Sequence, residues 1–345
     1  MMDAYVRDFA RWTPRAPALR LADRRVSYAE LDADVERQAA ALAAQGLAPG
    51  GGAVAVSTDD PYLRQVTELA LSRLEIAAAL HGAAGVPLQA PSLAGPPSRA
   101  PPARLPDPDG LAAVLPGAQG APVGVTWRRL ERMVFTALRT CCAGRQGTWI
   151  AADQLPPMAA LGLAAAGWSG GAAIAPDFAA GEIRERLETL PPGVIWTTPA
   201  GLADLVQALP AGIRVLPEWR VVCCGPGLDP AVARQARLDL TPDIHLLYGP
   251  EEAAFTAIGT AADLEGAAGF AGWVPSDTEA MILDARGDAV APGEAGELRI
   301  AGPRVASGYL DDAAASAVRF LGGAFRTGQL ASKLPDGRLV LHGAA

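Results

Sequence analysis

Residues 244–256, which read IHLLYGPEEAAFT, place a short apolar run directly before a Gly249-Pro250 turn and two adjacent carboxylates, Glu251 and Glu252. A strand that ends in a sharp turn with acid groups at its mouth is how an open α/β sheet forms a ligand crevice at its strand ends. A strand followed by a turn with two solvated glutamates explains the same residues without a site. The stretch therefore predicts a strand and a turn, and leaves ligand binding open.

Other segments of the chain add to this one. The turn Tyr248-Gly249-Pro250-Glu251-Glu252 resembles the Tyr-Gly-x-Thr-Glu turn of the adenylate-forming superfamily, which includes acyl- and aryl-CoA synthetases, the adenylation domains of peptide synthetases and luciferase. Further segments resemble that family's motifs in the same order along the chain: Thr13-Pro14 through Leu31, Val221-Val222-Cys223-Cys224-Gly225-Pro226-Gly227-Leu228, Pro292-Gly293-Glu294-Ala295-Gly296-Glu297-Leu298, Ser307-Gly308-Tyr309-Leu310 and Phe325-Arg326-Thr327-Gly328-Gln329-Leu330. The resemblance covers nearly the whole chain.

The periodicity of the chain predicts the same class of fold. Apolar strands alternate with helices of 10–15 residues between about 126 and 240, which is typical of a doubly wound, mostly parallel α/β sheet region. From 269 to 341 short alternating strands with Gly/Asp turns predict a small antiparallel β-barrel-like unit. We expect an α/β adenylation-like core over 1–268 with a Pro-rich linker at 90–108, and a small β subdomain over 269–345. The family's C-terminal lid domain is expected to be absent.

Composition limits the classes of partner. Of 345 residues, 50% are hydrophobic and 19% are charged, which indicates a globular protein with a large core. The net charge of −8 argues against nucleic acid or an anionic membrane as the main partner. We see no apolar run of 18 residues, and so no membrane span. Two adjacent cysteine pairs, Cys141-Cys142 and Cys223-Cys224, favour reduced thiols in a cytoplasmic protein.

The segment 115–125, LPGAQGAPVGV, resembles the loop that holds the triphosphate of ATP in the family. Its Gly117, Gln119 and Gly120 stand at positions of that loop, but the hydroxyl groups are missing and Val123 replaces the lysine. Charge-assisted contacts to phosphate contribute roughly 1.5–3 kcal/mol each. The resemblance therefore implies that ATP or AMP and Mg²⁺ bind weakly. A plain glycine-rich loop is the alternative.

The resemblance implies roles for residues of the motifs above. Gly225, Pro226 and Gly227 would flank the adenine, and Tyr248, Gly249 and Pro250 would form the turn beside it. Glu252 would be the catalytic carboxylate and the Mg²⁺ ligand.

Three positions depart from the family's pattern. Glu251 replaces the threonine of the turn and, without a metal, would repel phosphate. Gln329 replaces the aspartate that holds the ribose, and Ala344 replaces an arginine.

The acid-binding pocket has weaker candidates. Asp153 would hold an amino group of the substrate only if the alignment slips by a residue, and a loop or N-cap aspartate is the plainer reading. A packed or capped side chain is likewise the plainer reading of His245. Trp168 and Trp273 are expected in the core.

Two functions of different classes follow. One is an ATP-dependent ligase of secondary or fatty-acid metabolism that activates a small carboxylic acid as an acyl or aryl adenylate, with CoA or an acyl or peptidyl carrier protein as candidate acceptors. The other is a catalytically inactive adenylation-like pseudo-enzyme that binds an acyl or aryl ligand, a carrier protein or a biosynthetic partner. The triple substitution Val123→Lys, Ala118→Thr and Gln329→Asp, which restores an ammonium, a hydroxyl and a carboxylate, is predicted to recover ATP binding.

Overall fold

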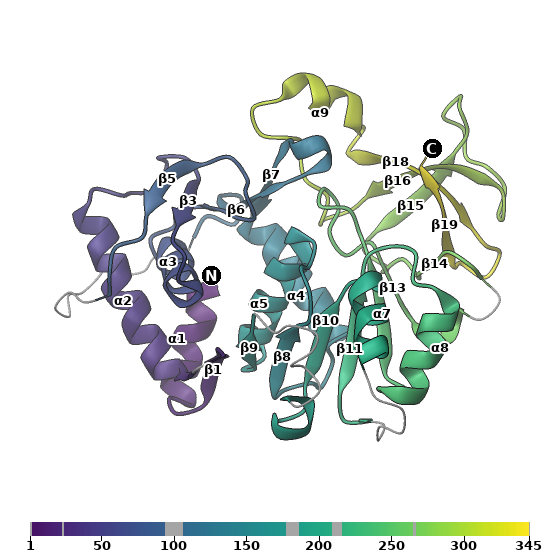
Figure 1. Cartoon of the computed structure of the whole chain (residues 1–345). Helices are drawn as coiled ribbons and strands as arrows, with labels where there is room; N and C mark the ends of the chain where they lie inside the picture. The colour runs from purple at the N-terminus through teal and green to yellow at the C-terminus, as the bar shows by residue number, and fades with distance from the viewer. Residues whose placement is uncertain are drawn as a thin grey trace.

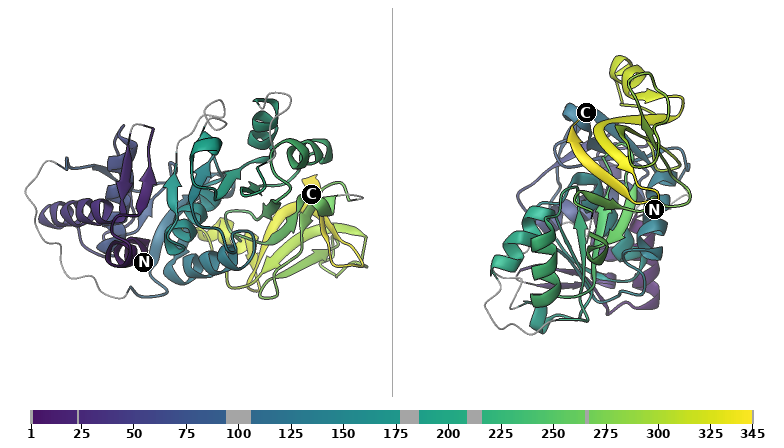
Figure 2. Two further views of the ribbon diagram at one scale, coloured as in Figure 1. Left: turned by 90° about the horizontal axis from the view of Figure 1, so that it is seen from below. Right: turned by 90° about the vertical axis from the view of Figure 1, so that its right-hand side faces the viewer.

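A computed structural model describes residues 2–22, 24–93, 106–176, 186–208, 216–264 and 267–344 of the chain. Figure 1 shows helices packed around a central sheet, with a second, smaller group of strands at the C-terminal end. Within these residues the strands form sheets of eight, six and five strands. The predicted α/β sheet region followed by a small antiparallel unit is confirmed, and Figure 2 shows the two groups of strands side by side.

The eight-stranded sheet has the order β13-β12-β11-β10-β8-β9-β1-β2. Its strands are β1 (Pro17–Arg20), β2 (Arg25–Ser27), β8 (Thr148–Ala151), β9 (Ala173–Ala175), β10 (Val194–Thr197), β11 (Arg220–Cys224), β12 (Ile244–Tyr248) and β13 (Ala257–Thr260). Neighbours from β12 to β1 are parallel, and the edge strands β2 and β13 are antiparallel. The carboxyl ends of β11 and β12 consequently lie at one edge.

Helices cover both faces of this sheet because successive strand residues point to opposite sides. Trp149 and Trp196 enter one hydrophobic cluster, whereas Ile150 and Ile195 enter another. The first cluster contains residues of α1 (Met2–Trp12), α2 (Tyr28–Ala44), α3 (Pro61–Arg73), α4 (Trp127–Arg139) and α5 (Pro157–Ser169). The second contains residues of α7 (Pro199–Ala208) and α8 (Pro230–Asp239).

The five-stranded sheet was only partly expected. Its order is β5-β3-β4-β6-β7, with β3 (Val54–Ser57), β4 (Ala78–Ala79), β5 (Val86–Gln89), β6 (Leu111–Pro116) and β7 (Pro122–Thr126). The glycine-rich segment is thus the tip of an antiparallel hairpin, closed by the 3₁₀ turn η1 (Ala118–Gly120). The hairpin forms because the side chains of Ala113, Leu115, Val123 and Val125 are all buried.

The C-terminal sheet is antiparallel and has the order β14-β19-β18-β16-β15, with β17 paired to β18. Its strands are β14 (Phe270–Gly272), β15 (Glu279–Leu283), β16 (Ala295–Ala301), β17 (Phe320–Leu321), β18 (Ala324–Lys333) and β19 (Leu339–Ala344). The helix α9 (Ala313–Arg319) precedes β17 and was not predicted. Figure 1 shows α9 beside the tip of the β6–β7 hairpin.

Two helices end earlier than the apolar periodicity of the sequence predicts. Helix α1 ends at Trp12, before the Pro14–Pro17 segment, and α3 ends at Arg73 although a helix was expected to residue 80, because 78–79 pair as β4. The predicted helix over 179–190 and the linker over 90–108 fall largely on residues outside those described. The Ser-x-x-Glu pattern of Ser27 and Glu30 predicts a capping box at the start of α2. The structure confirms it, with the Ser27 N–H donating to Glu30 Oε2 at 2.8 Å.

Two further findings concern membrane-spanning helices and the state of the cysteines. Across the described ranges, no helix is both long and apolar enough to cross a bilayer. The four cysteines are buried and free. The boundary at residues 268 and 269 stays a prediction, although β14 begins close to it.

Candidate functional site

The turn after β12 is held by its own backbone. Thr256 N–H donates to Tyr248 O at 2.8 Å, and Ala254 N–H donates to Pro250 O at 2.8 Å. Residue 249 must be glycine, because a Cβ there would lie 1.3 Å from Ala254 O. The chain therefore presents Glu251 and Glu252 at a fixed position at the end of β12.

Glu252 is directed at the glycine-rich hairpin. Its side chain is 2% exposed, and Oε1 accepts hydrogen bonds from Ala118 N–H at 2.6 Å and from the Tyr309 hydroxyl at 3.0 Å. A Cβ at Gly117 would come within 2.9 Å of the same oxygen, so glycine is required there for this approach. Two segments that the sequence singled out separately thus meet at one carboxylate oxygen.

Glu251 points the other way, to the first turn of α5. Its Oε2 accepts the Met158 N–H at 2.7 Å. This contact satisfies one of the unpaired N–H groups at the start of the helix and is favoured by the helix dipole. Burial, together with the neighbouring charge of Glu252, raises the pKa of Glu251 to about 7, although the Met158 N–H and Arg129 oppose the shift. Glu251 is therefore half-titrated near neutral pH.

Two buried arginines lie behind the turn, and the sequence reading missed both. Arg129 is 3% exposed and donates to Arg304 O at 2.5 Å, to Gly124 O at 3.1 Å and to Glu251 O. Burial lowers the pKa of Arg129 to about 10, and the charges of both glutamates oppose that shift. Arg129 therefore joins the hairpin to the turn through backbone oxygens.

Arg304 completes this support. It is 1% exposed and donates to Phe255 O at 3.1 Å, to Thr136 Oγ1 at 2.9 Å and to Asp277 Oδ1 at 2.9 Å. These partners belong to the turn, to α4 and to the segment before β15. No motif marks Arg129 or Arg304, and the three-dimensional contacts alone give them their role.

The loop over 117–121 satisfies most of its own donors. Gly117 N–H donates to Ala121 O at 2.8 Å, Gly120 N–H to Gly117 O at 3.0 Å, and Ala121 N–H to Ala118 O at 3.2 Å. Gly120 has a φ of +80°, which a glycine adopts without strain. The Ala118 N–H is given to Glu252, where a bound anion would otherwise accept it. Gln119 lies in this turn.

Val123, which the resemblance matches to a lysine of the phosphate loop, has a side chain that is fully buried (0% exposed). It packs in the cluster that also contains Tyr248 and Tyr309, and it pairs with Tyr309 across an antiparallel bridge. The Cβ of a lysine at position 123 would lie inside this core. The Val123→Lys substitution proposed from the sequence would therefore restore a phosphate contact only if the lysine side chain could extend from the core to the loop.

The remaining predicted nucleotide contacts come from the ends of β11 and β12 and from β18 of the C-terminal sheet. Gly225 follows β11, has a φ of +120° and donates its N–H to Leu247 O at 2.9 Å. Pro226 and Gly227 after it are exposed. The Tyr248 hydroxyl donates to the Gln329 side-chain oxygen, which joins the turn to β18.

Mg²⁺ is the metal that the resemblance implies. Among the described residues no group of three or more His, Cys, Asp or Glu side chains could hold a metal ion. Mg²⁺ is commonly held by one or two carboxylates together with substrate phosphates. Glu252 fits that pattern as a single ligand, because both of its side-chain hydrogen bonds given above go to Oε1.

The candidates for the acid pocket have structural roles. Asp153 accepts the Thr198 N–H at 3.2 Å just before α7. His245 is bonded to Asp243 at 3.0 Å, and Trp168 is buried with its Nε1–H on Ala18 O at 3.1 Å. The prediction for Trp273 was wrong: it is 41% exposed and meets Phe270 only edge-on, because it lies just past the end of β14.

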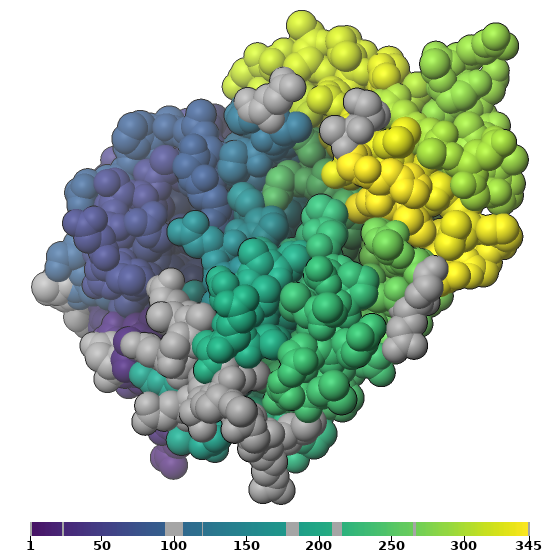
Figure 3. Space-filling model, turned by 45° about the vertical axis from the view of Figure 1, so that its right-hand side comes forward, coloured from purple at the N-terminus to yellow at the C-terminus, as the bar shows by residue number. Residues whose placement is uncertain are grey.

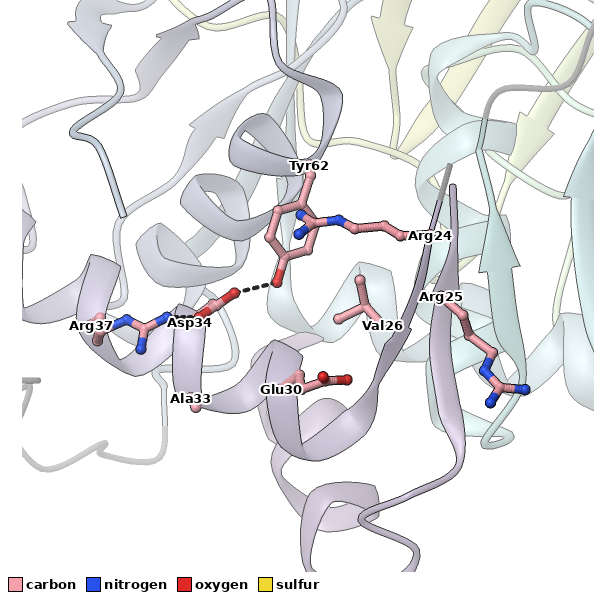
Figure 4. A pocket seen from close by; sticks show the side chains of 8 residues that line it. All are labelled: Arg24, Arg25, Val26, Glu30, Ala33, Asp34, Arg37 and Tyr62. Atoms are coloured by element: carbon pink, nitrogen blue, oxygen red, sulfur yellow. Dashed lines mark hydrogen bonds and ion pairs between the residues drawn. The ribbon is translucent and has the colours of Figure 1, made fainter. Parts of the chain in front are cut away.

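The structure has a hollow at the loop and another far from it. The first, about 280 Å³, is bounded by the loop and by α9. The second, also about 280 Å³, lies between β2, α2 and α3, where Asp34 bonds Arg37 and the Tyr62 hydroxyl and Arg24 lies over the Tyr62 ring at 3.9 Å (Figure 4). None of the predicted site residues lines this second hollow.

Comparison with known proteins identifies the class. Residues 117–310 match the family of AMP-binding enzymes, which is more than half of the chain. The chain belongs to this family of adenylate-forming proteins.

Solved structures support the fold. O-succinylbenzoate coenzyme A synthetase (MenE) from Bacillus subtilis in complex with AMP has a TM-score of 0.84, with 18% identity, over 99% of this chain and 78% of that one. Amide bond synthetase McbA from Marinactinospora thermotolerans has a TM-score of 0.81, with 23% identity, over 99% of this chain and 79% of that one.

Curated relatives match shorter stretches. Salicyl-AMP ligase / salicyl-S-ArCP synthetase of Mycobacterium tuberculosis is 34% identical over 122 residues, which are 34% of this chain and 21% of that protein. Vanchrobactin synthetase VabF of Vibrio anguillarum is 32% identical over 137 residues, which are 38% of this chain and 5% of that protein. This chain therefore matches only a minor part of each relative's length.

Proposed function

We propose that this chain binds a carboxylic acid and ATP·Mg²⁺ for adenylate formation, and that it holds the nucleotide weakly. In adenylate formation a carboxylate oxygen bonds to the α-phosphorus while the bond to the pyrophosphate leaving group breaks. Glu252 would hold Mg²⁺, Tyr248 and Gln329 would face the ribose, and Gly225–Gly227 would flank the adenine. An aryl or acyl acid is the substrate class, as the salicyl-AMP ligase named above suggests.

One observation carries the expectation of weak binding. The Ala118 N–H, the loop donor aimed out of the hairpin, is bonded to Glu252 at 2.6 Å. Binding a phosphate there would require the loss of this charge-assisted hydrogen bond, which contributes about 1.5–3 kcal/mol. The cation that would offset this loss is missing at Val123. CoA or a carrier protein would accept the acyl group, and the buried free thiols fit a reducing compartment such as the cytoplasm.

Calorimetry with ATP·Mg²⁺ tests this proposal, with Glu252→Gln as the matched variant. The amide keeps an acceptor for Ala118 and Tyr309 but loses the charge that would hold Mg²⁺. We expect a Kd on the order of 1 mM for the parent chain and no measurable metal-dependent binding for Glu252→Gln. A micromolar Kd, or identical affinities of the two proteins, would contradict the proposal.

A catalytically inactive binding protein is the second candidate. The internal satisfaction of the loop donors and the buried Val123 favour it. Exchange of labelled pyrophosphate into ATP, measured with a panel of aryl and fatty acids, separates the two. Exchange above background with any acid supports the ligase. A rise in melting temperature with an acid but no exchange supports the binding protein.

A further inference from the structure

The hollow at the loop has two walls from distant parts of the sequence. Ala118, Gly120 and Ala121 line one wall, and Tyr309, Asp312 and Arg319 line the other. Its volume of about 280 Å³ is at the low end for ligand pockets. In Figure 3 the yellow-green segment that contains α9 stands next to the blue hairpin. The size suits a phosphate chain better than a whole nucleotide.

Arg319 brings a positive charge to this hollow. It is the last residue of α9, and its Nη1 donates to Arg326 O at 3.2 Å, which anchors the guanidinium. The other N–H groups of the guanidinium can still donate to a ligand. Among the described residues it has no ion-pair partner. The acid on the same wall, Asp312, is occupied as the N-cap of α9, where Oδ1 accepts the Ala315 N–H at 2.8 Å.

Tyr309 lines the hollow together with Arg319 and is hydrogen-bonded to Glu252. Burial raises the pKa of the Tyr309 phenol, Glu252 adds to that shift, and the charge of Arg319 opposes it. Tyr309 also donates to the Glu252 oxygen that holds Ala118. Ala118, Glu252 and Tyr309 thus form a continuous hydrogen-bonded group, and Arg319 lines the same hollow as Tyr309.

We propose that Arg319 is the phosphate-binding cation of this site and acts from α9 in place of the cation that Val123 cannot supply. A phosphate chain would bind the guanidinium and take the Ala118 N–H from Glu252. A guanidinium group can donate two parallel hydrogen bonds to two oxygens of one phosphate group. The binding of a phosphate chain is independent of the proposed function, and only the identification of the ligand as ATP rests on it.

Titration calorimetry of the full chain at low ionic strength, where charge contacts are strongest, provides the test. The ligands are tripolyphosphate, ATP·Mg²⁺ and adenosine, and the variants are Arg319→Gln, Arg319→Lys and Arg286→Gln. Arg286 is exposed in the turn after β15, so its variant has the same change of charge away from the hollow. We expect Arg319→Gln to weaken both phosphate ligands at least about tenfold, which equals 1.4 kcal/mol. Lysine should recover part of the loss, and Arg286→Gln should change little.

The adenosine arm separates a phosphate contact from general damage, since adenosine affinity should be the same in the parent and Arg319→Gln. Equal weakening of all three ligands would mean that Arg319 only supports the fold, and would overturn the inference. Unchanged phosphate affinity in Arg319→Gln would also overturn it while leaving the proposed function standing. Binding of tripolyphosphate but not ATP, lost in Arg319→Gln, would support the inference and contradict the proposed function. If no phosphate ligand binds the parent chain, both fail.

Discussion

The two sides of the Tyr248–Glu252 turn use charge in opposite ways. Behind the turn, Arg129 and Arg304 are 3% and 1% exposed, and their donors are spent on backbone oxygens, Thr136 and Asp277. In front of it, the loop meets the carboxylate of Glu252, with Arg319 across the hollow. The buried charges hold the turn in place, whereas on the side that would meet a ligand a carboxylate faces the loop and Arg319 lines the hollow.

Removing the support behind the turn should have the largest effect. Arg304→Ala leaves Phe255 O and Thr136 without their donor and Asp277 without its partner. Each buried acceptor left without its donor costs about 1–3 kcal/mol, and with the packing lost at this fully buried position the total should be about 3–5 kcal/mol, which urea denaturation measures. The exposed Arg286→Ala is the control and should change stability by less than about 0.5 kcal/mol. A loss of less than 1 kcal/mol in Arg304→Ala would mean that the turn does not depend on this arginine.

Placing a charge in front of the turn should have the second largest effect on stability. Val123→Lys puts an ammonium into a fully buried position and is expected to cost about 2–3 kcal/mol of stability, again by urea denaturation. Val123→Met is the control for volume, because it is long but uncharged. If the lysine variant is as stable as the methionine variant and binds ATP more tightly, its side chain has reached the loop, and the repair predicted from the sequence is right after all.

The two carboxylates of the turn can be told apart by pH. The pKa of Glu251 in the folded protein, about 7, lies above its ordinary value of 4.5, so the folded state holds the proton over that window and the unfolded state does not. The free energy of unfolding should therefore fall as pH rises from about 4.5 to 7, by about 1–2 kcal/mol for this group after allowance for solvent screening. Glu251→Gln should remove the part of the slope that Glu251 contributes and keep the acceptor for Met158.

A second carboxyl titrates in the same window and serves as the control. Burial raises the pKa of Glu68 to about 7, with Arg64 opposing the shift. Glu68→Gln should remove a separate part of the slope, and the double variant should remove both parts additively because the sites share no partner. A slope in Glu251→Gln as steep as that of the parent chain would show that this carboxyl is not held protonated by burial at the turn.

The smallest change in stability is expected from removing the hydrogen bond between the Tyr309 hydroxyl and Glu252. Tyr309→Phe removes one hydrogen bond to Glu252 and should cost about 1 kcal/mol. Thermal or urea unfolding of Tyr309→Phe, Glu252→Gln and the double variant gives the coupling between the two residues. Strictly additive losses would contradict the view that one carboxylate oxygen organises the loop and the turn.

The pattern of residues along the chain was sufficient to predict the α/β layers. Single-residue alternation sends Trp149 and Ile150 to opposite faces, and the Ser27–Glu30 capping box starts α2 as expected, because both depend on neighbours in the chain. The same reasoning missed the β6–β7 hairpin, since its glycine-rich tip reads as a loop until β4 and Tyr309 provide partners for its edges.

The candidate site divides in the same way. The motifs identified the turn, the loop and the loss of the lysine at Val123, all of which are properties of residue type and order. That Glu252 accepts the Ala118 N–H, that Glu251 faces α5, and that Arg304 and Arg319 reach the site from far along the chain were decided only by tertiary structure. The physical reason is range: propensity and periodicity act over a few neighbouring residues, whereas a hydrogen bond across 134 positions exists only once the sheets have packed.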